Sequence, residues 1–212
     1  EAMDKTKNPV FQNAEAEFYL AYKDGKVVGR IAAIVNWVEI EEQKKNKLRF
    51  GWYDTIDDVE VSKKLIEKVI EFGKKRKLDF IDGPVGFSNM DKAGLLTHGY
   101  EELNTMITWY HFPYQKNHLT DIGFKKLAEW VEYKIQIYSE KDAPEKVKKF
   151  AKIIQKRYDL KVINFKSTKE IIPYVDKMFE LLNVTYSNLQ TYVTIKQYQI
   201  DFYKEKFIKY IH

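Results

Sequence analysis

Glycine is confined to the first part of this 212-residue chain. All nine glycines lie at or before Gly123, and the rest of the sequence contains none. Because glycine supplies the backbone conformations that tight turns need, this distribution predicts a front part of strands and turns followed by a helical tail. The polar, proline-containing stretch from Ser139 to Pro144 marks the boundary. We therefore expect a domain over residues 1–139 and a tail over residues 140–212 that is helical apart from one strand.

Hydrophobic periodicity predicts the elements within each part. Asp24-Gly25 separates two apolar, β-rich runs and tolerates positive φ angles, which favours an antiparallel hairpin. The tail contains two sequences of the capping-box type, beginning at Ser167 and Thr194, each of which predicts a helix. The expected strands are Glu17–Lys23, Lys26–Trp37, Leu48–Tyr53, Asp79–Asp82, Thr105–His111, Trp130–Tyr138 and Leu160–Phe165. The expected helices are Val59–Lys77, with Asp57 or Asp58 as its cap, Asp91–Thr97, Tyr114–Leu127, Pro144–Tyr158, Thr168–Leu182 and Ile195–Ile211.

Composition excludes several classes of protein. The chain has no cysteine, which rules out disulfides, zinc–thiolate sites, iron–sulfur clusters and a cysteine nucleophile. No apolar run approaches a bilayer crossing and the first residues do not resemble a secretory signal, so we expect a soluble, cytoplasmic protein with no membrane partner. The net charge of +5 favours anionic partners only slightly. Most lysines stand among glutamates, which is typical of solvated surface and argues against a nucleic-acid site.

The order of the expected elements resembles that of GNAT-type N-acyltransferases, from the second strand of that fold onward. The hairpin segment Phe18–Ile34, the stretch Gly83-Pro84-Val85-Gly86-Phe87-Ser88-Asn89 and the stretch Gly94–Tyr100 look like those of a bacterial subgroup of the acyl-CoA N-acyltransferase superfamily. Members of that subgroup are longer and contain two GNAT-like halves. The resemblance implies an α+β fold with a mostly antiparallel central sheet and helices on both faces. The front domain would lack the opening strand and helices of one half, and the tail would either begin a second half or complete the first.

Acidic residues stand where the GNAT fold binds the pyrophosphate of acyl-CoA. In that fold a Gln/Arg-x-x-Gly-x-Gly/Ala turn presents backbone amides to the anion. Here the segment Thr55–Glu60 contains no glycine and three carboxylates. Repulsion of about 1 to 3 kcal/mol for each like-charge pair exceeds the ~0.3 to 1 kcal/mol that a helix end offers an anion. We therefore expect these acids to cap the helix, and acetyl-CoA or another acyl-CoA to be held by a loop in a half not fully present here.

Two residues are candidates for catalysis. His111 ends a predicted strand and could deprotonate an amine as a neutral imidazole, although a hydrogen-bonded structural histidine is the alternative. Tyr100 is the tyrosine nearest to the place where the resemblance implies an acid for the leaving thiolate. None of the four histidines has a neighbour at metal-site spacing, so no metal site is expected.

Six residues are candidates for substrate binding. Three belong to the loop after a short buried strand, where ligands bind in many sheets, and three are aromatic residues that could line a pocket. The alternatives are a simple proline–glycine turn and ordinary core packing. The candidates are Gly86, Ser88, Asn89, Trp52, Tyr53 and Tyr110.

Together these observations predict acyl transfer from acyl-CoA to an amine, with a small molecule or a peptide as the acceptor. The alternative is a non-catalytic interaction module on a degenerate GNAT fold. The sequence does not predict the oligomeric state, the acyl group or the acceptor.

Overall fold

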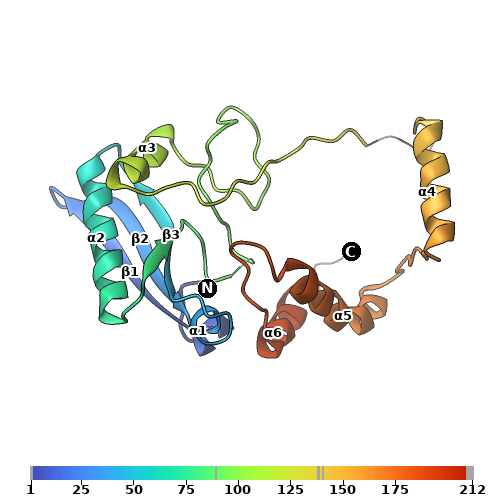
Figure 1. The fold of residues 1–212 in the computed structure, drawn as a ribbon, viewed down its shortest axis with the longest axis horizontal. Coiled ribbons are helices and arrows are strands. Elements are labelled where there is room, and N and C mark those ends of the chain that lie inside the picture. Colours follow the sequence, from blue (N-terminus) through green and yellow to red (C-terminus); the bar gives the residue numbers. More distant parts are fainter. Residues whose placement is uncertain (1, 89, 138, 140, 209–212) are drawn as a thin grey trace.

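The computed structural model describes residues 2–88, 90–137, 139 and 141–208 (Figure 1). Its β-sheet lies in the front part and has four strands in the order β1-β2-β3-β4. Two pairings are antiparallel and one is parallel, so the sheet is open and mixed. The strands are β1 (Ala14–Lys23), β2 (Lys26–Asn36), β3 (Lys47–Thr55) and β4 (Phe80–Asp82). The protein is thus an α+β protein, and the hairpin prediction is confirmed with Asp24 and Gly25 both at positive φ.

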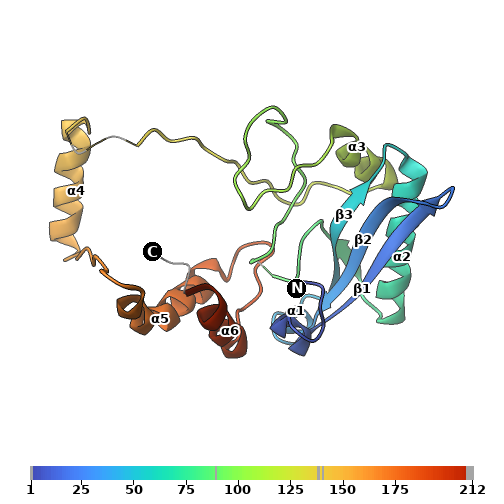
Figure 2. The same ribbon diagram turned by 180° about the vertical axis from the view of Figure 1, so that it is seen from behind.

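Helix α2 (Val59–Lys75) covers one face of the sheet (Figures 1 and 2). Asp58 caps it, because the Asp58 side chain accepts a hydrogen bond from the Glu60 backbone N–H at 3.0 Å. The apolar residues of α2 recur at helical spacing and are buried against β2, β3 and Leu119 of α3 (Pro113–Ile122). They include the predicted stripe Val61, Leu65, Val69 and Phe72.

The opposite face of the sheet is covered differently. Ala32 and Ile34 of β2 pack there against Val10 and Phe87, which belong to the 3₁₀ turn η1 (Pro9–Gln12) and to the loop after β4. Figure 2 shows no α-helix lying across this face. The expectation of helices on both faces is therefore wrong for the described residues, because a turn and a loop supply the apolar cover on this side.

Figure 1 shows that the helices of the tail lie away from the sheet, whereas the short helix after β2 lies beside it, with Trp37 and Ile40 packed against the sheet core. A short helix, α1 (Trp37–Glu41), follows β2, and the tail contains α4 (Glu145–Arg157), α5 (Thr168–Tyr186) and α6 (Gln197–Phe207). Helices α5 and α6 share a small core of Val175, Phe179, Ile195 and Ile200. The predicted tail helices are confirmed, but the last one begins at Gln197 with Lys196 as its cap, so the capping box predicted at Thr194 is wrong. The end predicted at Ile211 lies outside the described residues.

Four predicted elements are wrong. Residues 105–111 form a turn, since the hydroxyl groups of Thr105 and Thr108 both donate to the Glu132 carboxylate. Residues 91–97 are not helical, because the Gly94 N–H donates to the Pro84 carbonyl and Val85 bridges Ala93. Residues 130–137 and 160–165 are irregular because they have no strand partner among the described residues; Tyr138, the predicted end of one strand, lies outside those residues.

Candidate functional site

Strand β3 is interrupted by a bulge at its centre. Ala32 of β2 pairs with Gly51 and Arg30 pairs with Asp54, so the single residue between them on β2 faces both Trp52 and Tyr53. Trp52 has a φ of 48°, an unusual value for a bulky side chain. Bulges re-aim side chains and release backbone groups from the strand ladder, and they often lie beside functional sites.

The parallel strands β3 and β4 pair over only three residues each, from Lys47–Phe80 to Arg49–Asp82. Beyond that point the chain leaves β4 through Gly83 and Pro84 and passes close to β3. The Val85 N–H donates to the Phe50 carbonyl at 2.7 Å, and a Cβ on Gly51 would lie 2.4 Å from the Val85 oxygen. Only glycine at position 51 permits this approach of two backbones.

A pocket of about 220 Å³ lies where the bulge meets this loop. Its walls combine the bulge, the loop of residues 84–94 and the turn that contains Trp109 and His111. The volume is smaller than that of typical small-molecule sites, so it fits a head group better than a whole ligand. The pocket is lined by Ala2, Gly51, Trp52, Tyr53, Pro84, Val85, Gly86, Met90, Asp91, Lys92, Gly94, Trp109 and His111.

Four of the predicted site residues meet in this pocket: Trp52, Tyr53, Gly86 and His111. His111 is buried, and burial lowers the pKa of its imidazole below the ordinary value of 6.5. Its Nδ1 accepts a long hydrogen bond of 3.4 Å from the Leu96 N–H, which is weak at that distance. His111 is therefore a neutral imidazole at pH 7 in the pocket wall.

Among the described residues, the other predicted site residues do not line the pocket. The Tyr100 hydroxyl donates to the Leu96 carbonyl and its ring packs edge-on against Tyr110, which is itself exposed. The Ser88 hydroxyl accepts a hydrogen bond from the Met90 N–H, as in a turn. Asn89 lies outside the described residues.

The first turn of α2, where the GNAT fold would hold a pyrophosphate, is occupied by the chain's own groups. Asp58 caps the helix and forms an ion pair with Lys23 at 2.9 Å. Asp57 lies 3.2 Å from Nε2 of His118. The prediction that acids cap this helix is confirmed for Asp58.

His118 also contacts a serine. Its Nδ1 lies 2.9 Å from the hydroxyl of Ser62, which in turn lies 2.8 Å from the Tyr53 hydroxyl. Ser62 is fully buried, so it cannot attack a substrate. This Ser62–His118–Asp57 arrangement therefore joins α2 to α3 and is not a hydrolytic triad.

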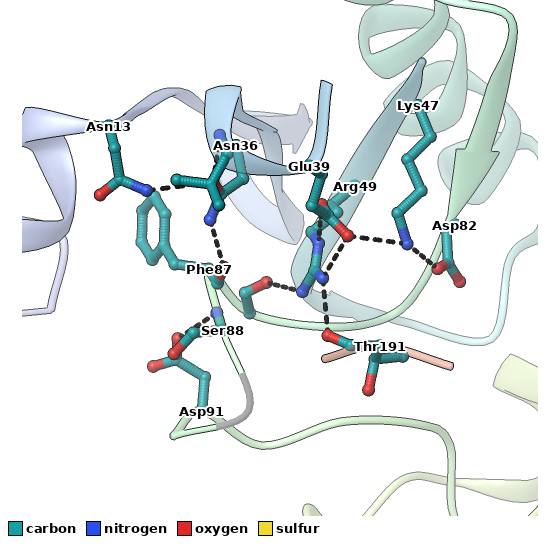
Figure 3. A network of polar contacts seen from close by, with 12 residues as sticks. Asn13, Asn36, Glu39, Lys47, Arg49, Asp82, Phe87, Ser88, Asp91 and Thr191 are labelled. Atoms are coloured by element: carbon teal, nitrogen blue, oxygen red, sulfur yellow. Dashed lines mark hydrogen bonds and ion pairs between the residues drawn. The ribbon is translucent and has the colours of Figure 1, made fainter. Parts of the chain in front are cut away.

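Four buried charges lie beside the pocket (Figure 3). The carboxylate of Glu39 contacts Arg49 Nε at 2.6 Å and Lys47 Nζ at 3.0 Å, and Lys47 contacts Asp82 at 2.7 Å. Arg49 also donates to the carbonyl of Gly86 in the pocket wall and to that of Thr191 in the tail, at 3.0 and 2.8 Å. We call Glu39, Lys47, Arg49 and Asp82 the ion cluster. Its charges balance, and it ties the pocket loop to the sheet and the tail.

Sequence reasoning missed Asp91 and Lys92 in the pocket wall. Asp91 was expected at the start of a helix, but its carboxylate accepts a hydrogen bond from the Ser88 N–H at 3.1 Å. A Cβ on Gly86 would lie 2.2 Å from the Cβ of Asp91, so glycine is required there. Gly86 and Asp91 stand five residues apart in the sequence, and only the fold shows that they touch.

No family model matches the chain, and no solved structure is significantly similar to it. Two curated relatives are each 25% identical to it. One is Protein YghO of Escherichia coli (strain K12), over 177 residues that make up 82% of this chain and 44% of the relative. The other is a bacterial ceramide synthase of Caulobacter vibrioides (strain NA1000 / CB15N), over 136 residues, 63% of this chain and 35% of that protein. The chain thus matches less than half the length of either relative.

The described residues contain neither a helix that could span a membrane nor a cluster of metal-binding side chains. No helix there is long and apolar enough to cross a bilayer. No group of three or more histidine, aspartate or glutamate side chains in that part of the chain is arranged to hold a metal ion.

Proposed function

We propose that this chain belongs to an N-acyltransferase that moves an acyl group from acyl-CoA to an amine. The observation that carries the proposal is the pocket itself, where a strand bulge, two tryptophans and a neutral histidine meet. The similarity to a bacterial ceramide synthase supports it, because a ceramide is an amide of a fatty acid and a long-chain amine. Forming that bond is acyl transfer to nitrogen.

The reaction needs few protein groups. The amine nitrogen attacks the thioester carbonyl carbon, a C–N bond forms and the C–S bond breaks. In our proposal His111 accepts the proton that the attacking nitrogen loses, and a backbone N–H of the bulge binds the carbonyl oxygen. The CoA thiolate leaves and takes up a proton. General base catalysis contributes about 10² to 10⁴ in rate, and alignment of the two substrates contributes the rest.

The pyrophosphate of acyl-CoA does not bind at the first turn of α2 in this proposal. Asp57, Asp58 and Glu60 place three carboxylates there, and Lys23 already neutralises one of them. An anion at this turn would have to displace an ion pair and two hydrogen-bonded side chains. The acyl-CoA phosphates therefore bind outside the Thr55–Glu60 turn.

Release of free CoA thiol tests the proposal. The chain is mixed with acyl-CoA thioesters of increasing length and a panel of primary amines, and thiol is measured with a colorimetric reagent. We expect amine-dependent release, and a loss of about 100-fold in kcat for His111→Gln. His98→Gln is the matched control, since His98 does not line the pocket. Absence of amine-dependent release with every pair would overturn the proposal and leave the non-catalytic interaction module.

A further inference from the structure

Asp91 is the one acidic side chain among the described residues that line the pocket. Its position is set on two sides. One carboxylate oxygen accepts the Ser88 N–H, and the carboxyl group packs directly on Gly86, where a Cβ would lie 2.8 Å from Oδ2. The loop therefore holds this carboxylate in place at the pocket wall.

No ion pair of the described residues includes Asp91. The guanidinium of Arg49, whose charge acts on Asp91, is already bound to Glu39 and to the carbonyls of Gly86 and Thr191. The neighbouring ammonium of Lys92 lies over the Trp109 ring, 5.2 Å from its centre. Asp91 is thus a half-buried carboxylate that accepts a hydrogen bond from backbone and forms no ion pair among the described residues.

The surroundings of Asp91 also act on its pKa. Burial raises the pKa of Asp91 above its ordinary value of 3.8, despite the backbone hydrogen bonds and the charge of Arg49 that lower it. Burial and then the charge of Asp91 raise the pKa of Tyr203, on α6, to about 12. A buried carboxylate without a cation costs free energy, which an incoming cation recovers.

The remaining walls also suit an organic cation. The pocket has two tryptophans, and indole rings attract ammonium groups placed over their faces. Arg30 and Lys92 already lie over the Trp109 ring, so Trp52 is the indole that suits an incoming ammonium. Trp52 contacts the ring of Phe18, which is partly exposed on β1, so an apolar surface continues outward from the pocket. A volume of about 220 Å³ admits an ammonium head group while an attached chain extends outside.

We propose that Asp91 binds the ammonium group of the acceptor amine, with Trp52 beside it. This inference rests on the proposed function and adds the substrate contact that selects an amine. Asp91 holds the ammonium form in the pocket, and one proton of the ammonium passes to solvent before attack. His111, in the same pocket wall, accepts the second proton, which the nitrogen loses as the C–N bond forms. Lys92 is not part of this contact, because its ammonium stays on Trp109 and repels a second cation.

Calorimetry with three probes of equal length tests the binding directly. The probes are octylammonium, 1-octanol and octanoate. We expect the wild-type chain to bind octylammonium about 10- to 100-fold more tightly than 1-octanol. Asp91→Asn should remove this preference, and Lys92→Met should retain or increase it. Asp91→Ser provides a second uncharged side chain, and a thermal melt of each variant shows whether it is folded.

Two results would overturn the inference: an unchanged ammonium preference in folded Asp91→Asn, or a preference for octanoate that Lys92→Met removes. The thiol assay separates this inference from the proposed function. If the wild-type chain releases CoA and Asp91→Asn leaves the KM for the amine unchanged, the inference fails and the function stands. If ammonium binding depends on Asp91 but no acyl-CoA and amine pair reacts, the function fails and the binding site stands.

Discussion

The sheet region and helix α4 differ in which side chains they bury. Between β2 and β4, even four charged residues are buried, and each meets a partner of opposite charge within 3.0 Å. Helix α4 has a regular apolar stripe that includes Val147 and Phe150, yet none of its residues is buried. An amphipathic pattern therefore predicts that a helix forms, while burial depends on a partner surface close in the fold.

The largest effect is expected from the ion cluster. Glu39→Gln leaves Lys47 and Arg49 with only Asp82 as a buried anion. An uncompensated buried charge costs about 3 to 5 kcal/mol in the free energy of unfolding. Urea denaturation measures this loss. Glu39→Gln combined with Arg49→Met restores charge balance and should be more stable than the single variant. Equal stability of Glu39→Gln and wild type would show that the cluster does not stabilise the sheet region.

A smaller loss is expected at the contact between α2 and α3. Ser62→Ala removes the hydroxyl that contacts both Tyr53 and His118, leaving two buried polar groups without that partner. The expected cost is about 1 to 3 kcal/mol by the same denaturation. Ser187→Ala, in an exposed turn of the tail, is the matched control. A cost at Ser62 no larger than at Ser187 would contradict the role of this network.

Asp91→Asn should change stability in the opposite direction. The folded-state pKa of Asp91 is raised, so folding favours the protonated carboxyl group. The stability of the fold relative to the unfolded chain therefore decreases as the pH rises through the folded-state pKa and the carboxyl group ionises. Asparagine keeps an oxygen for the Ser88 N–H without the charge. We expect a higher Tm for the variant at pH 7, and equal Tm values below about pH 3.8, where the carboxyl is protonated even in the unfolded chain. A lower Tm at pH 7 would mean that the charge stabilises the fold.

The smallest effect is expected in the irregular segment of residues 130–137. Ile137 is 93% exposed, so Ile137→Lys should change the free energy of unfolding by less than about 0.5 kcal/mol. Ile34→Lys is the comparison, because Ile34 is fully buried in β2 and should be severely destabilised. A large loss at Ile137 would show that the segment is covered in solution, and the contrast between the two regions would then fail.

The sequence predicted the elements whose information is local. The Asp24-Gly25 turn and the helical spacing of the apolar residues of α2 are local signals, and the structure contains both the hairpin and the helix. The strands predicted at 105–111 and 130–138 are absent from the described residues because a strand needs a partner. The hydrogen bond between the side chains of Thr105 and Glu132, which are far apart in the sequence, could not be predicted from a local pattern. The boundary between residues 139 and 140 stays a prediction.

Part of the candidate site could be predicted from residue types in the sequence. The rest depends on contacts that only the folded structure shows. Trp52 and His111 were predicted from residue type and position, and both line the pocket. Asp91 was not, because its importance depends on a contact with Gly86 and on the absence of a nearby free cation. Tyr100 was predicted because it is the tyrosine nearest in sequence to the expected position of the acid. In the structure its hydroxyl donates a hydrogen bond to the Leu96 carbonyl.

Hydrogen exchange with a bound N-alkyl amide, the product of the proposed reaction, tests the central claim most directly. The account predicts slower exchange at residues 50–53 and 85–94, where the bulge and the loop form the pocket. Slower exchange confined to residues 55–60, or no change anywhere in the front part, would contradict it.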